Sequence, residues 1–384
     1  MKKIVVWLTV LITVMSVIIP VKAEGPEIEA PCAILTEAST GRVIYEKNAD
    51  ESLHPASITK IMTLLIIFDA IDDGSIAPDD TVTVSEHAAS MGGSQVFLEP
   101  GETQTVETMI KCIAIASAND ACVAMAEHIS GSEDAFVQSM NERAEALGMS
   151  NTHFVNCCGL DADGHMTTAR DVAIMSRELI TAHPAIHDYS CIWMDTITHV
   201  TRRGESEFVL NNTNKLLKQY EWATGLKTGS TSLAKFCLSA TARRNDIELI
   251  SVIMASPSGK TRVSDSIALL NYGYGICSLY HDNNMPSIDV IPIKGGIRSD
   301  ISVEYSSQMN YLFTDKYDAS LIESHAEYLE DLEAPVQKGD VVGQLTYTYD
   351  GKFMDSVDII ASESIKKAVY GDYMNSLWQC FLGN

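Results

Sequence analysis

The chain has 384 residues, of which 46% are apolar and 20% charged. This is the composition of a folded globular protein, and the length allows two domains with sizeable cores. The formal net charge of −24 at neutral pH argues against nucleic acid as a partner and against docking on anionic lipid by charge alone.

The N-terminus has the pattern of a secretory signal peptide, which we place at residues 1–23. Lys2 and Lys3 form a positively charged start, residues 4–19 an apolar run, and Val21-Lys22-Ala23 a small-residue cleavage site. An uncleaved anchor is the alternative, because the apolar run is near the lower limit for a membrane span. We therefore expect an exported protein. Cleavage would remove three lysines and no acid, so the formal charge would become −27.

The next part of the chain mixes strands with a block of helices. The predicted elements are a hairpin in CAILTEASTGRVIYEKN, a buried helical run from Ser57, a helical stretch from about 107 to 147 interrupted at 117–120 and Gly131, a helix after the capping-box pair Thr168 and Asp171, strands between about 195 and 256, and a helical segment at 264–275. Strands on both sides of a block of helices predict an α+β domain, which we assign to residues 24–284.

The composition changes from about residue 285. Residues 285–362 read as short strands separated by turns, with Asp350-Gly351 as a hairpin signal, and predict a small all-β domain. The final segment, 363–384, has aromatic and apolar residues at helical spacing. It would either contact a membrane interface peripherally or dock on the β domain.

The nine cysteines do not form a recognisable framework. Their number is odd, their spacing is irregular, and most lie in apolar runs, where a free cysteine behaves as a small hydrophobic residue. No Cys or His cluster has metal-ligand spacing, so the sequence predicts neither a metal nor another cofactor.

One lysine stands out because it lies in a strongly apolar run, HPASITKIMTLLIIFDAI, at residues 54–71. Lys60 follows Ser57 by three residues, so on a helix the two side chains share a face. Burial disfavours the charged form of a lysine, and a neutral amine could take the serine proton. The spacing alone is weak evidence, because it recurs at Ser232–Lys235, which reads as part of a strand, and at Ser364–Lys367.

Two further motifs make the first one specific. Ser117-Ala118-Asn119 interrupts the alanine-rich helical region, and Lys227-Thr228-Gly229 lies in a strand-like segment. Ser-x-x-Lys, Ser-x-Asn and Lys-Thr-Gly in this order are the signature of active-site-serine enzymes that react with penicillin. From about Ala33 to Gly275 the chain resembles the low-molecular-mass penicillin-binding proteins that are serine-type D-alanyl-D-alanine carboxypeptidases.

The resemblance implies a fold and a role for each motif residue. The fold would be the β-lactamase/transpeptidase type, an antiparallel sheet flanked by helices plus a helical subdomain. The partner would be the peptidoglycan stem peptide, with β-lactam antibiotics as covalent inhibitors. The implied roles are Ser57 as nucleophile, Lys60 as base, Ser117 as proton relay, Asn119 as ligand of the substrate amide, Lys227 and Thr228 as ligands of the terminal carboxylate, Gly229 as a close-approach position, and the backbone N–H groups of Ser57 and Ser230 as oxyanion hole.

Four other positions are weaker candidates. Arg262 would either hold the substrate carboxylate or be solvated. Asn212 and Asn214 precede the Lys-Thr-Gly strand. They would either line the cleft or form a turn, and we expect the turn. His165 lies in a loop before a helix cap, and we expect a structural role for it.

Three other functions are alternatives to carboxypeptidase activity. A β-lactamase of class A deacylates with a glutamate downstream of the Ser-x-Asn, but GMSNTHFVNCCGLDADGH contains none. A D,D-endopeptidase uses the same chemistry on cross-bridges, and the sequence does not separate it from a carboxypeptidase. A scaffold would have no reason to keep a lysine in an apolar helix.

Overall fold

The computed structural model describes residues 25–202, 204–288 and 290–374. The predicted signal peptide and the last ten residues of the C-terminal segment lie outside these ranges. No helix within the described residues combines the length and apolarity needed to cross a membrane.

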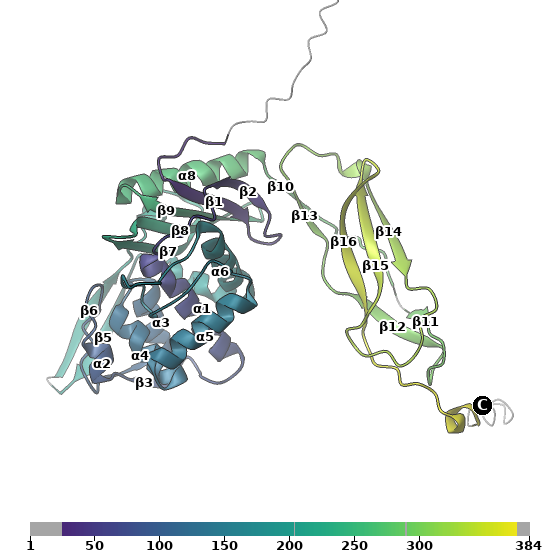
Figure 1. Cartoon of the computed structure of the whole chain (residues 1–384), viewed down its shortest axis with the longest axis horizontal. Coiled ribbons are helices and arrows are strands. Elements are labelled where there is room, and N and C mark those ends of the chain that lie inside the picture. Colours follow the sequence, from purple (N-terminus) through teal and green to yellow (C-terminus); the bar gives the residue numbers. More distant parts are fainter. Residues whose placement is uncertain (1–24, 203, 289, 375–384) are drawn as a thin grey trace, which may run out of the picture.

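The first part of the chain is built on a five-stranded antiparallel sheet (Figure 1). In chain order its strands are β1 (Cys32–Glu37), β2 (Val43–Lys47), β7 (Ala223–Thr231), β8 (Lys235–Arg244) and β9 (Ile247–Ser256), and their spatial order is β2-β1-β9-β8-β7. Helix α8 (Gly259–Ile276) packs on one face and α6 (Ala169–Ala182) on the other. β9 is consequently buried along nearly its whole length. The expected α+β fold is confirmed, and β7 is left as an edge strand.

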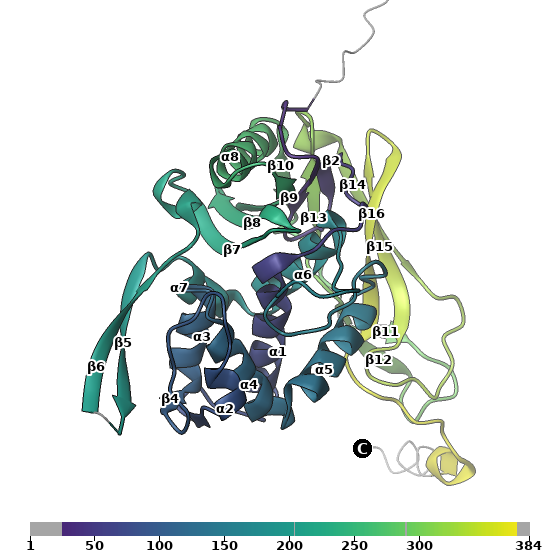
Figure 2. The ribbon, with the colours of Figure 1, turned by 60° about the vertical axis from the view of Figure 1, so that its left-hand side comes forward.

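The helices gather beside this sheet around α1, as Figure 2 shows. They are the 3₁₀ turn η1 (Ala56–Thr59), α1 (Lys60–Asp72), α2 (Glu86–Ala89), α3 (Val106–Ala114), α4 (Asn119–Ser130) and α5 (Glu133–Ala146). α1 is buried on every face except near its C-terminal end, as its apolar sequence requires. The break between α4 and α5 falls at Gly131, whose φ of 78° ends α4 in the left-handed region.

Helix α6 begins at the predicted cap, but only half of the capping box forms. The Thr168 hydroxyl accepts a hydrogen bond from the Asp171 N–H at 3.1 Å. The Asp171 carboxylate instead accepts from the Asn151 N–H and the Thr152 hydroxyl. Asp171 therefore ties the preceding loop to the helix.

Short elements connect the helices to the sheet. They are the pair β3 (Thr81–Thr83) and β4 (Thr103–Thr105), η2 (Pro184–Ile186), α7 (His187–Ser190), the hairpin of β5 (Met194–Thr201) and β6 (Gly204–Asn211), and η3 (Lys215–Lys218). The β5–β6 hairpin extends away from the helices in the view of Figure 2. The prediction that Ser232 lies in a strand is wrong, because residues 232–234 form the turn between β7 and β8.

The C-terminal part is a second sheet, in the order β11-β12-β16-β15-β14. Its strands are β11 (Val290–Pro292), β12 (Asp300–Tyr305), β14 (Ile322–Tyr328), β15 (Val341–Tyr349) and β16 (Lys352–Ala361), with η4 (Ala319–Leu321) before β14. β10 (Ser278–His281) pairs with β13 (Asn310–Phe313) where the chain leaves α8. Asp350 and Gly351 both have positive φ and form the predicted hairpin turn. The expectation of an all-β C-terminal fold is confirmed.

Candidate active site

The predicted serine and lysine lie together where η1 runs into α1. The Lys60 side chain is fully buried, and its Nζ lies 3.2 Å from Ser57 Oγ. In a 3₁₀ turn the side chains at i and i+3 eclipse each other, so this short element brings the two groups together more directly than an α-helix would.

Two closer acceptors hold the Lys60 amine. Nζ donates to Asn119 Oδ1 at 2.6 Å and to the backbone carbonyl of Cys158 at 2.6 Å. These bonds use two N–H groups of the amine. The third tetrahedral position faces Ser57 Oγ at the longer distance, where a neutral amine has its lone pair. The arrangement therefore suits transfer of the Ser57 proton to Lys60.

Asn119 is fixed from both sides. Its Nδ2 donates to the Gly92 carbonyl at 2.7 Å, and its backbone N–H donates to the Ser94 carbonyl at 2.7 Å. The amide orientation is thereby set, with Oδ1 toward Lys60. Asn119 therefore positions Lys60, and its role as a ligand of the substrate amide stays a prediction.

Ser117 occupies a strained and unsatisfied position just before α4. Its φ is 61°, in a region that non-glycine residues rarely adopt. Its hydroxyl is buried and has no hydrogen-bond partner among the described residues. Strain and an unpaired buried donor are both unfavourable by themselves and are concentrated at functional sites in proteins.

Strand β7 runs directly past the nucleophile, and Gly229 makes this possible. A Cβ added at Gly229 would lie 2.9 Å from the Ser57 backbone nitrogen and 3.0 Å from that of Ile58. The sequence-based reason for this glycine, close approach of the substrate backbone, therefore needs correction. The crowding comes from the backbone of η1, which β7 contacts.

Lys227 and Thr228 precede Gly229 on the same strand. Lys227 is buried, and its Nζ donates to the Thr228 carbonyl at 3.3 Å. Burial and, secondarily, the positive charge of Lys60 hold the pKa of Lys227 well below its usual value. The Thr228 hydroxyl is hydrogen-bonded to the Thr213 hydroxyl at 2.7 Å. An anionic ligand near Lys227 would stabilise its charged form.

The remaining candidate residues either hold neighbouring elements together or lie at the protein surface. Arg262, in the first turn of α8, donates through Nη1 to the carbonyls of Gly229 at 2.9 Å and Cys237 at 3.0 Å, and so braces β7 and β8. The Ser230 side chain is exposed. The Asn214 N–H donates to Asn212 Oδ1, which is the local bond of the expected turn. The side-chain amides instead reach other elements: Asn212 donates to the Ser190 and Ile192 carbonyls, and Asn214 donates to the Gly225 carbonyl.

His165 is held as a neutral ring. Its Nδ1 accepts from the Val155 N–H at 2.9 Å, so the proton is on Nε2, which lies 2.8 Å from the Thr59 hydroxyl. That hydroxyl in turn donates to the Ala56 carbonyl at 2.8 Å. Burial, with the neighbouring His54 and His153, lowers the pKa of His165 to about 4. The expected structural role is confirmed by these contacts, which fasten the loop at 153–165 to η1.

One member of the site carries no sequence signal. The Cys158 carbonyl belongs to the backbone, so any residue type at this position would provide it. Only Gly159 offers a hint, since a Cβ there would lie 1.8 Å from the Ala56 carbonyl oxygen. The loop must therefore pack against η1 without a side chain.

A partly exposed serine paired with a buried lysine beneath an edge strand, in an α+β domain followed by an all-β domain, defines a penicillin-binding type of serine peptidase. Two family models agree with this class. D-alanyl-D-alanine carboxypeptidase matches residues 19–258, and the C-terminal domain of penicillin-binding protein 5 matches residues 286–367. The chain belongs to the D-alanyl-D-alanine carboxypeptidase family.

Individual relatives match along most of the chain. The D-alanyl-D-alanine carboxypeptidase DacF of Bacillus subtilis is 41% identical, over 88% of this chain and 87% of its own. DacC of Escherichia coli is 31% identical, over 92% and 88%. Among solved structures, penicillin-binding protein 5 of Haemophilus influenzae superposes with a TM-score of 0.76 at 28% identity, covering 90% of this chain and 99% of that one.

The buried neutral His165 makes stability depend on pH. The unfolded chain binds a proton at this residue near the usual histidine pKa, whereas the folded protein binds it only near 4, so stability is present above the unfolded pKa and is lost as the pH falls toward 4. We expect this residue to lower the free energy of unfolding by about 3 kcal/mol between neutral pH and pH ~4. Urea unfolding across this range measures it.

The matched variants are His165→Gln and His128→Gln. His128 is exposed on α4, so its replacement should leave the pH dependence unchanged. Replacement of His165 should lower stability at neutral pH and flatten the dependence between pH ~4 and ~6.5. An unflattened curve for His165→Gln would show that another group titrates.

Proposed function

We propose that this D-alanyl-D-alanine carboxypeptidase removes the terminal D-alanine from peptidoglycan pentapeptide stems through an acyl-enzyme on Ser57. The observation that carries the assignment is the Lys60 amine, which faces Ser57 Oγ at 3.2 Å while two shorter hydrogen bonds fix its other positions. A buried amine held in this way is a positioned general base.

The first half-reaction forms an ester. Lys60 takes the Ser57 proton as Oγ bonds to the carbonyl carbon of the penultimate D-alanine. The backbone N–H groups of Ser57 and Ser230 stabilise the oxyanion, a contribution of about 3 kcal/mol per donor in comparable sites. The C–N bond then breaks, and the departing amine of D-alanine receives the proton by way of the Ser117 hydroxyl.

The second half-reaction returns the enzyme. Water attacks the ester carbonyl, its proton passes to Lys60, and the C–O bond to Ser57 breaks with return of the proton to Oγ. This restores Ser57 and leaves a stem shortened by one residue. Atoms and charges balance without any cofactor.

Substrate recognition follows from the position of β7. As the edge strand of the sheet it has a free side on which an extended peptide can add as a further strand. Lys227 and Thr228 on this strand would bind the terminal carboxylate, and Asn119 the amide of the stem. Because the pKa of Lys227 is lowered in the free enzyme, binding a carboxylate beside it draws a proton onto its amine.

Slow hydrolysis of the ester that penicillin forms with Ser57 would distinguish this enzyme from a β-lactamase. The loop that packs against η1, residues 148–165, contains no glutamate, and its two aspartates, Asp161 and Asp163, are exposed. A penicillin acyl-enzyme on Ser57 therefore lacks a buried carboxylate to activate water. β-Lactams should act as long-lived covalent inhibitors.

We place the protein outside the cytoplasm, in the cell wall or on the outer face of the membrane. Its substrate is there, and residues 1–23 read as a signal peptide. The C-terminal segment ends the described chain in a helical turn with Val369, Tyr370 and Tyr373 exposed. Exposed aromatic residues beside Lys366 and Lys367 suit peripheral contact with a bilayer surface.

Benzylpenicillin followed by peptide mass spectrometry tests the nucleophile. We expect one adduct, on Ser57, and none in Ser57→Ala. Ser232→Ala is the matched control, because Ser232 has the same spacing to a lysine but lies in a turn. Lys60→Ala should slow adduct formation by about 10²- to 10⁴-fold. An adduct on any other serine would refute the assignment.

Muropeptide digestion tests the substrate. We expect pentapeptides to become tetrapeptides with release of D-alanine, while cross-linked dimers stay intact. The reason is that Lys227 would bind the free carboxylate of the terminal D-alanine, which lies on the departing amine side of the cleaved bond. Loss of dimers without D-alanine release would instead assign an endopeptidase.

Cosedimentation with phospholipid vesicles tests the membrane contact. We expect the chain from residue 24 to bind and a chain ending at Ala368 to stay in solution. The shorter chain keeps Ile365, which is buried in the β domain and pairs with Val336, so its fold should be unaffected. Equal sedimentation of both would refute the contact.

A further inference from the structure

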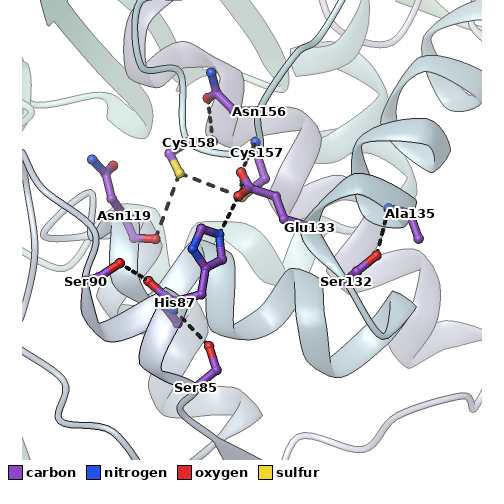
Figure 3. Close-up of polar contacts among 11 residues, drawn as sticks. Ser85, His87, Ser90, Asn119, Ser132, Glu133, Ala135, Asn156, Cys157 and Cys158 are labelled. Carbon is purple, nitrogen blue, oxygen red and sulfur yellow. Dashed lines mark hydrogen bonds and ion pairs between the residues drawn. The ribbon is translucent and has the colours of Figure 1, made fainter.

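Two adjacent cysteines lie next to the active site, and their thiols take no part in the proposed reaction. Cys157 and Cys158 are both buried, and all eight cysteines in the described part of the chain are free thiols. Their sulfur atoms lie 3.7 Å apart. Figure 3 shows them facing Glu133, the first residue of α5, with His87 on the other side of its carboxylate.

Two of the three distances among these groups match those of a tetrahedral metal site. Two sulfur ligands at about 2.3 Å from a tetrahedral Zn²⁺ lie about 3.8 Å apart. A sulfur and a carboxylate oxygen on the same ion lie about 3.5 Å apart. The observed separations are 3.7 Å between the two Sγ atoms and 3.4 Å between Cys157 Sγ and Glu133 Oε1. All three ligand atoms lie within 4.8 Å of one another.

We propose that Cys157, Cys158 and Glu133 form a binding site for a thiophilic divalent cation of the zinc class, with His87 positioning the carboxylate. His87 Nε2 lies 3.0 Å from Glu133 Oε2, the oxygen that does not face Cys157. A metal-binding carboxylate is commonly held by such an outer partner. The three protein ligands leave the fourth tetrahedral position for water.

The charges of the site also fit a cation. Each thiol gives up its proton to solvent as its sulfur–metal bond forms, so two thiolates, one carboxylate and a divalent ion carry a net charge of −1. The Lys60 side chain lies nearby, bonded to the Cys158 carbonyl. A disulfide is a poorer use of the pair, since the sulfur atoms would have to approach to about 2.0 Å.

The site has a route to solvent and a fixed frame. The His87 side chain is 53% exposed and that of Glu133 is 17% exposed, so a cation can enter from their side. Glu133 Oε1 also accepts from the Cys157 N–H at 3.2 Å. Asn156 Oδ1 accepts from the N–H groups of Cys158 and Gly159, which fixes the loop beyond the thiols.

Titration of the reduced, chelator-treated protein with Co²⁺ tests the proposal. We expect one equivalent to bind with the absorption of a tetrahedral cobalt–thiolate centre, and Zn²⁺ to displace it. Cys157→Ser and Cys158→Ser should each abolish the thiolate band. Cys191→Ser, which removes an exposed thiol elsewhere, should leave it unchanged.

A second pair of variants avoids the buried positions. His87→Ala should weaken Co²⁺ binding by about 10- to 100-fold, whereas His128→Ala, at another exposed position, should not. No stoichiometric binding by the wild-type protein would overturn the proposal, as would a band that survives loss of both Cys157 and Cys158 or disappears with Cys191. None of these readouts requires the enzyme to be active, so they are independent of the carboxypeptidase assignment.

Discussion

A lysine amine inside an apolar core is the constraint on which the first domain depends. Removing such a group from water is unfavourable by several kcal/mol unless polar partners compensate for it. Lys60 has three, Ser57 Oγ, Asn119 Oδ1 and the Cys158 carbonyl. They come from η1, from the start of α4 and from the loop after α5. The amine is therefore satisfied only when these three parts of the chain have come together, and the same contacts aim it at the nucleophile.

Some of the departures from ordinary backbone geometry and polar satisfaction lie around this amine. Ser117 has a left-handed φ and a hydroxyl without a hydrogen-bond partner among the described residues. Gly229 allows the backbone of β7 to approach the backbone of η1 closely. Arg262 braces the far side of the same strand through the Gly229 carbonyl. Such features destabilise a fold unless its surroundings enforce them. Here the sheet on one side and α4 on the other enforce them.

Much of the fold and the site could be predicted from side-chain patterns. The apolar run after Ser57 predicted the buried helix α1, and Thr168 predicted the start of α6. The three motifs predicted the residues that meet in the site. What the sequence does not encode is backbone geometry. The 3₁₀ form of η1 and the role of the Cys158 carbonyl leave no trace in residue types. The thiol–carboxylate cluster was missed for a related reason: motif spacing treats Cys157 and Cys158 as an isolated pair, whereas Glu133 is 24 residues away and is brought there by α5.

The loop after α5 contributes both to the Ser57–Lys60 site and to the proposed cation site. Its one face supplies the carbonyl that holds Lys60, and its other face carries the two thiols. Gly159 allows it to contact η1, while Asn156 fixes three successive N–H groups, those of Cys158, Gly159 and Leu160. His165 anchors its end through Thr59 to the same turn that carries Ser57. A rigid segment with fixed contacts on both faces cannot change on one without displacing the other. Cys158 carries both the carbonyl that accepts from Lys60 and one thiol of the pair, so a cation bound to that thiol would act on the residue that holds the amine.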